Sequence, residues 1–95
     1  MFVVLLRFSA NKSQAAEFIE GHNAWLKSGF DDGVFLSAGS LQPNLGGGIV
    51  AYNTSLADLQ SRVGNDPFVA KNVVSAEILE ISVVKADSRL EFLMD

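Results

Sequence analysis

The stretch from Phe2 to Phe8 constrains the fold more than any other part of the chain, because it is apolar at every position except Arg7. It is short, rich in Phe, Val and Leu, and followed by Ser9-Ala10-Asn11, which is typical of a buried strand and not of a helix. Side chains alternate along a strand, so the even-numbered residues point to one face and Val3 and Leu5 to the other. Both faces of this predicted strand are therefore apolar.

The rest of the chain divides into two helices and three strands. Apolar residues recur at helical spacing from Ala15 to Leu26, with Ser13 as the expected N-cap and Gly29 as the expected stop. Asn53-Thr54-Ser55 supplies a second cap. In order, we expect a strand over 2–8, a helix over 13–29, strands over 34–39 and 46–52, a helix over 56–64, a short turn over 66–70 and a strand over 77–85.

This β-α-β-β-α-β order is that of ferredoxin-like α+β domains, in which an antiparallel sheet carries both helices on one face. Ninety-five residues are enough for one domain, so we expect residues 1–95 to form a single unit. The composition is 48% hydrophobic, which is rich for so small a body. Because the helices cover one face of the sheet, the other apolar face is most simply covered by a second copy. The sequence therefore predicts a homodimer.

Charge and amino-acid usage disfavour several kinds of function. Seven basic and eleven acidic residues give a net charge of −4, and Lys and Arg form no cluster. Nucleic-acid binding needs a positive surface and is disfavoured. There is no cysteine, so there are no disulfides and no thiolate nucleophile, and zinc would have only His22 and carboxylates as ligands. We expect no metal site and no cofactor.

The apolar N-terminal run is too short to cross a membrane. It ends at Arg7 after five apolar residues beyond the initiator, whereas a spanning helix needs about 20. It also lacks a basic region before the apolar residues. We expect no membrane association and a cytoplasmic protein.

His22 is the only histidine, and histidine is the side chain whose unperturbed pKa of about 6.5 permits proton exchange near neutral pH. It follows Ile19 by three residues and precedes Leu26 by four, which places it on the buried face of the first helix. A buried imidazole needs a hydrogen-bond partner. The partner is either Asp66, which would create an acid-base pair, or a backbone group or water in a packed core.

Asp66 has a structural explanation as well as a chemical one. Aspartate is a preferred N-cap and proline is favoured at the first helical position, so Asp66-Pro67 predicts the start of a short helix. The two roles are compatible, since one carboxylate oxygen can cap while the other accepts from an imidazole N–H. The sequence leaves both roles open.

Other candidate ligand-binding residues lie near the strand ends. Backbone N–H groups at Gly39 and Ser40 could receive a substrate oxygen, although hairpin geometry also explains the nearby glycines at 46–48. No phosphate loop is present, and Ser40 lacks the nucleophile elbow that a catalytic triad would need. Arg7 either extends to the sheet edge or presents its guanidinium to a carboxylate ligand. Phe68 is expected in the core or in a pocket wall.

Several of these residues together resemble the YciI-like, or YCII-related, family of small dimeric α+β barrel proteins. The resemblance rests on His22 with Leu26, on Gly33 followed by 34–36 and then Ala38-Gly39, on the glycine-led third strand, and on Asp66-Pro67-Phe68. It covers nearly the whole chain, from the first strand to position 85.

The resemblance implies a ferredoxin-like protomer that pairs face to face, with a pocket in each protomer where His22 and Asp66 meet. The family resembles muconolactone isomerases in architecture, and some members act as dehalogenases of chlorinated muconolactones. The chain also departs from the family pattern. Ser40 stands where a proline commonly follows the strand-end glycine, and the arginine often found a turn or more before the histidine is missing.

The sequence thus predicts a small-molecule enzyme of lyase, isomerase or dehalogenase type, acting by proton transfer on a small carbonyl or lactone-like compound. His22 would act as base and acid, Asp66 would fix its tautomer, and the backbone near Gly39 and Ser40 would receive negative charge. The alternative is a homodimer that binds a ligand or a partner without chemistry, and fold analogy does not choose between the two.

Overall fold

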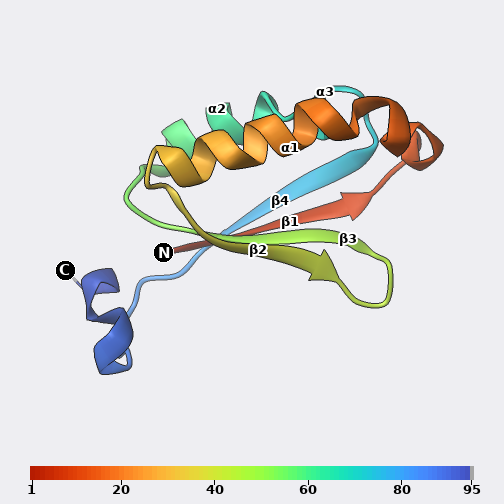
Figure 1. Ribbon diagram of the computed structural model, residues 1–95. Helices are drawn as coiled ribbons and strands as arrows, with labels where there is room; N and C mark the ends of the chain where they lie inside the picture. Colours follow the sequence, from red (N-terminus) through yellow and green to blue (C-terminus); the bar gives the residue numbers. More distant parts are fainter. Residues whose placement is uncertain (95) are drawn as a thin grey trace.

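Within residues 1–94, four strands form one antiparallel sheet in the order β2-β3-β1-β4, and three α-helices lie on one side of it (Figure 1). The computed structural model describes residues 1–94. The strands are β1 (Phe2–Phe8), β2 (Phe35–Leu41), β3 (Gly46–Ala51) and β4 (Val74–Glu80). The helices are α1 (Ala15–Asp31), α2 (Leu56–Gly64) and α3 (Pro67–Ala70), with 3₁₀ segments η1 (Lys12–Gln14) and η2 (Ser88–Leu93). The fold is α+β and ferredoxin-like, as the order of elements predicts.

The pairing register assigns each strand residue to a face of the sheet. Val4 of β1 lies opposite Ile49 of β3 and Ile78 of β4, and directly paired residues share a face. This face meets the helices and carries the core. The buried apolar residues of the core are Phe2, Val4, Leu6, Val34, Phe35, Ile49, Ala51, Leu59, Val63, Phe68, Val73 and Val74.

Helix α1 differs from its prediction at both ends. Ser13 lies inside η1 and does not cap α1, whose N-cap residue is Gln14 without a side-chain cap bond. Gly29 does not end the helix. It is buried within α1, and a Cβ atom at this position would lie 2.1 Å from the Phe35 ring. Glycine at 29 therefore allows α1 to approach β2, and the chain reverses later at Gly33, where φ is +73°.

Strand β4 begins and ends earlier than the predicted range of 77–85. It starts at Val74, opposite Phe8, and stops at Glu80, opposite Phe2. The apolar alternation continues past Glu80, but β1 begins at Phe2 and leaves no further strand to pair with. Beyond Glu80, Ile81 exchanges two hydrogen bonds with Met1. Its N–H donates to the Met1 carbonyl at 2.8 Å, and its carbonyl accepts from the Met1 amino group at 3.2 Å.

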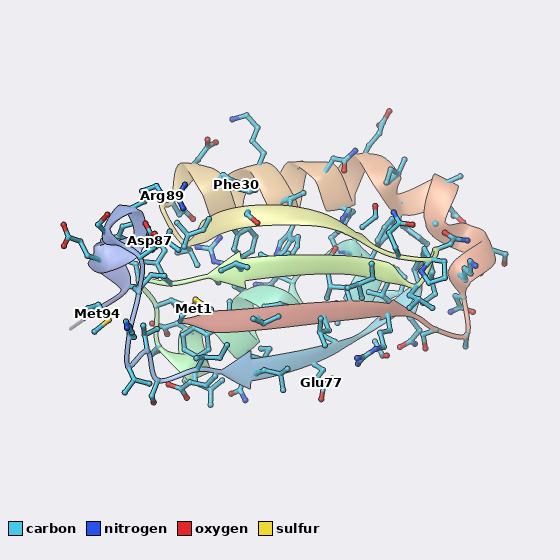
Figure 2. The ribbon with its side chains drawn as sticks, turned by 90° about the horizontal axis from the view of Figure 1, so that it is seen from below. Met1, Phe30, Glu77, Asp87, Arg89 and Met94 are labelled. Atoms are coloured by element: carbon cyan, nitrogen blue, oxygen red, sulfur yellow. The ribbon has the colours of Figure 1, made fainter. Side chains whose placement is uncertain are left out.

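The sheet face opposite the helices is open, and no other element of residues 1–94 lies over it (Figure 2). Val3, Leu5, Val50 and Leu79 lie on this face by register. Beyond β4 the chain leads to η2, which lies past the end of the sheet near the N-terminus (Figure 1). There Phe92 packs edge-on against Tyr52, with ring centroids 5.2 Å apart.

Candidate active site

His22 and Asp66 meet although 44 residues separate them in the sequence. Nδ1 of His22 lies 2.9 Å from Oδ1 of Asp66, a hydrogen-bond distance. The His22 side chain is 15% exposed, whereas Asp66 is fully buried. Helix α1 presents the imidazole, and the residue preceding α3 presents the carboxylate. The distance lies within the 2.6 to 3.2 Å expected for a base and its partner.

Asp66 also caps α3, but it uses one oxygen for both contacts. Oδ1 accepts from the Phe68 backbone N–H at 3.0 Å as well as from the imidazole. Two separate oxygens could have made these two contacts. Instead Oδ2 is buried and has no hydrogen-bond partner within residues 1–94. The cap and the imidazole therefore share a single acceptor atom.

The tautomer of His22 follows from this contact. When Asp66 is ionised its carboxylate only accepts hydrogen bonds, so a neutral imidazole in contact with it carries its proton on Nδ1 and donates that proton to Asp66. The unprotonated nitrogen is then Nε2. Nε2 lies across the ring from Nδ1, and its lone pair is available to take a proton.

Aromatic rings fix the orientation of the imidazole. Phe68 stacks on His22 with centroids 4.1 Å apart and an interplanar angle of 6°. Trp25 packs near the same ring at 5.8 Å and 29°, and its own Nε1–H donates to the Arg62 carbonyl at 2.8 Å. The imidazole is thus held by one hydrogen bond and by stacking.

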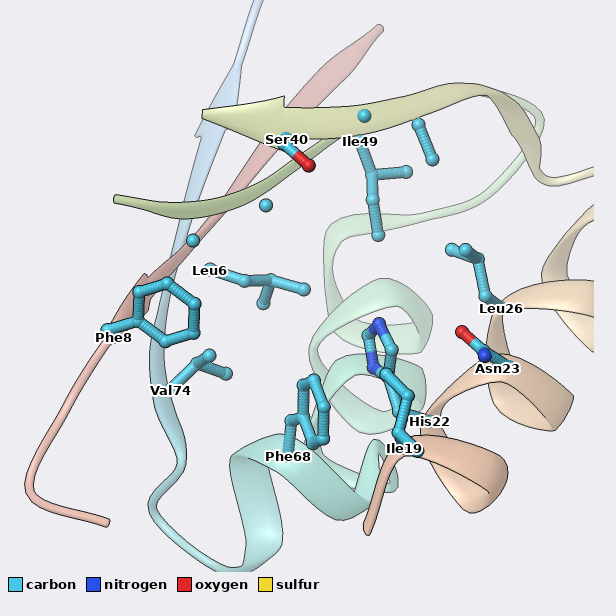
Figure 3. Close-up of a pocket in the computed structure, with 15 residues that line it drawn as sticks. Leu6, Phe8, Ile19, His22, Asn23, Leu26, Ser40, Ile49, Phe68 and Val74 are labelled. Atoms are coloured by element: carbon cyan, nitrogen blue, oxygen red, sulfur yellow. The ribbon is translucent and has the colours of Figure 1, made fainter. Parts of the chain in front are cut away.

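A cavity of about 340 Å³ opens beside His22, between α1 and the sheet (Figure 3). The helix layer contributes Ile19, Asn23 and Leu26 to its lining together with His22 and Phe68. The sheet contributes Leu6, Ile49 and the glycine-rich ends of β2 and β3. The walls are mostly apolar, with a few polar groups, which is the usual character of a small-molecule site.

Ser40 and Gly39 contribute to the cavity in different ways. Ser40 pairs with Gly47, which places its side chain on the helix-facing side of the sheet, and its hydroxyl points into the cavity (Figure 3). Gly39 pairs with Gly48 and lines the cavity with backbone atoms only. Four of the predicted site residues, His22, Phe68, Gly39 and Ser40, therefore line one cavity, and Asp66 lies behind it.

Arg7 is not brought to this cavity. It shares the face of β1 that carries Val3 and Leu5, opposite to Leu6. Its Nη1 donates to Oε1 of Glu77 on β4 at 2.7 Å, and both side chains are about half exposed. Arg7 therefore lies on the opposite face of the sheet from the cavity beside His22.

Two kinds of lining residue were missed by sequence reasoning. Asn23 follows His22 directly and stands at the cavity wall (Figure 3), but nothing in its local sequence marks it. Gly47 was grouped with its neighbours as hairpin glycine, and only the register shows that it lies between Leu6 and Ser40. Strand alternation could have separated Gly47 from Gly46 and Gly48.

The described residues offer little for a metal ion. Within residues 1–94 there is no group of three or more His, Cys, Asp or Glu side chains placed to hold one. Across the same residues, no helix has the length and apolar character needed to cross a membrane.

Comparison with known proteins gives a likeness of fold. No protein-family model matches the chain, and no curated protein matches it. Among solved structures, it is similar to 5-chloro-2-hydroxyhydroquinone dehydrochlorinase from Burkholderia phenoliruptrix, solved in complex with 2,5-dihydroxybenzoquinone. The identity is 15%, the TM-score is 0.68, and the match covers 86% of this chain and 94% of the other. This supports a relationship at the level of the fold.

Proposed function

We propose that this protein is a small-molecule enzyme of lyase, isomerase or dehalogenase type that transfers a proton on a small carbonyl or lactone-like compound. The observation that carries the proposal is the 2.9 Å contact between His22 and a fully buried Asp66 at the wall of a cavity. The dehydrochlorinase of similar fold, which was solved with a small quinone, supports the same class of chemistry.

In the proposed reaction Nε2 of His22 removes a proton from the substrate and returns it to a second atom. The resulting imidazolium is stabilised by Asp66, which also keeps the ring in the productive tautomer. Negative charge on the substrate oxygen is received on the sheet side of the cavity, by Ser40 and the backbone near Gly39. Phe68 holds the imidazole plane by stacking.

Titration of the single imidazole tests whether the pair is coupled without knowledge of the substrate. We expect the His22 resonances to titrate at lower pH in Asp66→Asn than in the unmodified protein, because the negative charge that favours imidazolium is removed. Asp32→Asn is a suitable control, since Asp32 pairs with Arg62 and not with His22. Equal titration in all three proteins would contradict the proposed role of Asp66.

A second candidate is a homodimer that binds a ligand or partner without catalysis. The open apolar face of the sheet favours a second copy as its cover, and Asp66 would then serve only as the cap of α3. Pairing through this face is also part of our leading proposal. A cytoplasmic location stays a prediction of the sequence.

A further inference from the structure

The cavity beside His22 is poor in charge. Within residues 1–94, His22 is the only lining residue with an ionisable side chain. Ser40 and Asn23 add neutral polar groups, and most of the remaining lining side chains are apolar. A ligand that fits this lining has an apolar body with a few hydroxyl or carbonyl oxygens.

The His22 and Asp66 pair does not supply a net positive charge. With a neutral imidazole the pair carries the charge of the buried carboxylate, and with an imidazolium the two charges cancel. An anionic ligand would therefore enter a site that is neutral or negative, in a chain whose net charge is −4. Moving a carboxylate out of water without a cationic partner is costly.

Two basic side chains adjoin residues of the cavity lining and are engaged elsewhere. Arg7 lies on the opposite face of the sheet and pairs with Glu77. Lys12 places its ammonium 4.6 Å from the centroid of the Phe8 ring, and it is not part of the cavity lining. Because Phe8 lines the cavity, an effect of the Lys12 charge on ligand binding has to be tested with a control variant at this position.

Gly47 leaves the sheet side of the cavity without a side chain. A Cβ atom there would find only the Gly39 carbonyl oxygen, at 3.5 Å, which is an ordinary contact. The backbone therefore does not require glycine at this position, unlike at Gly46, where φ is +132° and a Cβ would clash with the Leu6 carbonyl. The missing side chain at 47 keeps open the space between Leu6 and Ser40.

We propose that this cavity selects small uncharged ring compounds carrying hydroxyl or carbonyl oxygens, that it excludes carboxylates, and that Gly47 sets the size of ring admitted. The inference rests on the proposed function of the same site and names its ligand class. A volume of about 340 Å³ lies at the small end of ligand sites, and a cavity of about 150 Å³ already holds benzene. One substituted ring fits, with polar groups meeting Ser40 on one side and His22 on the other.

The test compares two probes of similar size, hydroquinone and 4-hydroxybenzoate, at pH 7. Binding is followed by NMR through the His22 ring resonances and the backbone amides at 39, 40 and 47. We expect hydroquinone to shift these resonances and 4-hydroxybenzoate to bind at least tenfold more weakly. Lys12→Met should leave both affinities unchanged.

Substitution at Gly47 tests the size limit. Gly47→Val should lower hydroquinone affinity at least tenfold, and Gly47→Ala by less, because the added atoms occupy the cavity. Valine is compatible with a strand. Gly64→Ala is the matched control, since an added Cβ there meets nothing within 4 Å and the residue does not line the cavity. Circular dichroism and urea denaturation establish that each variant is folded.

The proposal is overturned if 4-hydroxybenzoate binds as tightly as hydroquinone, if neither binds, or if a folded Gly47→Val binds like the unmodified protein. None of these outcomes changes the result expected from titrating His22 in Asp66→Asn. A wrong ligand class can therefore be distinguished from a wrong assignment of the His22 and Asp66 pair. Selective ring binding with no coupling between His22 and Asp66 would indicate a binding site without the proposed chemistry.

Discussion

Asp66 is buried more completely than its role as a cap requires. Aspartate is rarely fully buried unless it is paired. An N-cap needs only one of its two carboxylate oxygens, as the acceptor for a backbone N–H. Here both hydrogen bonds converge on Oδ1, and Oδ2, which has no hydrogen-bond partner within residues 1–94, is buried with it. A buried acceptor without a partner costs about 1 to 3 kcal/mol. Capping alone does not account for this arrangement, which supports our proposal that Asp66 belongs to the site.

Asp66→Ala should lower the free energy of unfolding by about 1 to 2 kcal/mol, because it removes the cap on the Phe68 N–H and the partner of His22. Asp66→Asn keeps an oxygen acceptor and should cost less. Ser55→Ala is the control, since Ser55 caps α2 through a 3.1 Å bond from the Asp58 N–H and should cost about 1 kcal/mol. Urea denaturation followed by Trp25 fluorescence measures all three. A loss for Asp66→Ala below that for Ser55→Ala would favour a purely capping role.

His22→Asn should abolish turnover while changing stability little. The amide can retain one hydrogen bond to Asp66, but it cannot shuttle a proton. Chloride release from a chlorinated hydroquinone, or loss of a lactone followed by NMR, provides the assay. Activity of the unmodified protein that survives in a folded His22→Asn variant would show that the proton does not pass through the imidazole.

At the scale of elements, the approach of α1 to β2 depends on Gly29. Alanine is the better helix former by about 1 kcal/mol, yet its Cβ at 29 would overlap the Phe35 ring. Overpacking of a core typically costs about 1 to 3 kcal/mol, so Gly29→Ala should destabilise the protein despite its helix propensity. Gly64→Ala, with open space around the added atom, should be neutral or stabilising. Thermal unfolding of the two variants gives the sign of each change in stability. A Gly29→Ala variant at least as stable as the unmodified protein would contradict the packing of Gly29 against Phe35.

The order of the elements could be predicted from local patterns, whereas several boundaries could not. The second cap, Ser55, and the end of α2 at Gly64 are set by neighbouring residues and agree with the prediction. The end of β4 depends on where β1 begins, and Gly29 serves the close packing of α1 on the Phe35 ring instead of ending the helix. Both are tertiary effects that a local pattern does not contain.

The site, like the elements, could be predicted only in part. Helical spacing placed His22 on the inner face, and Asp66-Pro67 predicted the cap, but their meeting depends on how α1 and α3 pack. Strand alternation could have separated Gly47 from Gly46 and Gly48, but only the register shows that it lies between Leu6 and Ser40. Arg7 could have been separated from the cavity, because strand alternation already placed it on the face away from Leu6.

At the scale of the whole molecule, the apolar face of the sheet opposite the helices is not covered by any other element within residues 1–94. Val3, Leu5 and Val50 are only half-buried there, and Leu79 is 44% exposed. The ion pair between Arg7 and Glu77 stands on the same face. An apolar centre beside a charged pair is the pattern of a protein interface, which supports our proposal that a second copy covers this face.

Leu79→Glu should therefore convert a dimer into a monomer, because it would bury a charge without a partner in the proposed interface. Leu56→Glu is the matched control. It changes a leucine of similar exposure, 38% against 44%. Leu56 lies at the start of α2 in the helix layer, where a negative charge is tolerated.

Light scattering at micromolar concentration should give twice the chain mass for the unmodified protein and for Leu56→Glu, and the chain mass for Leu79→Glu. The dimer should bury more than about 1,000 Å² in total. A monomeric mass for the unmodified protein would refute pairing through this face, whereas a Leu79→Glu dimer would place the contact elsewhere on the molecule.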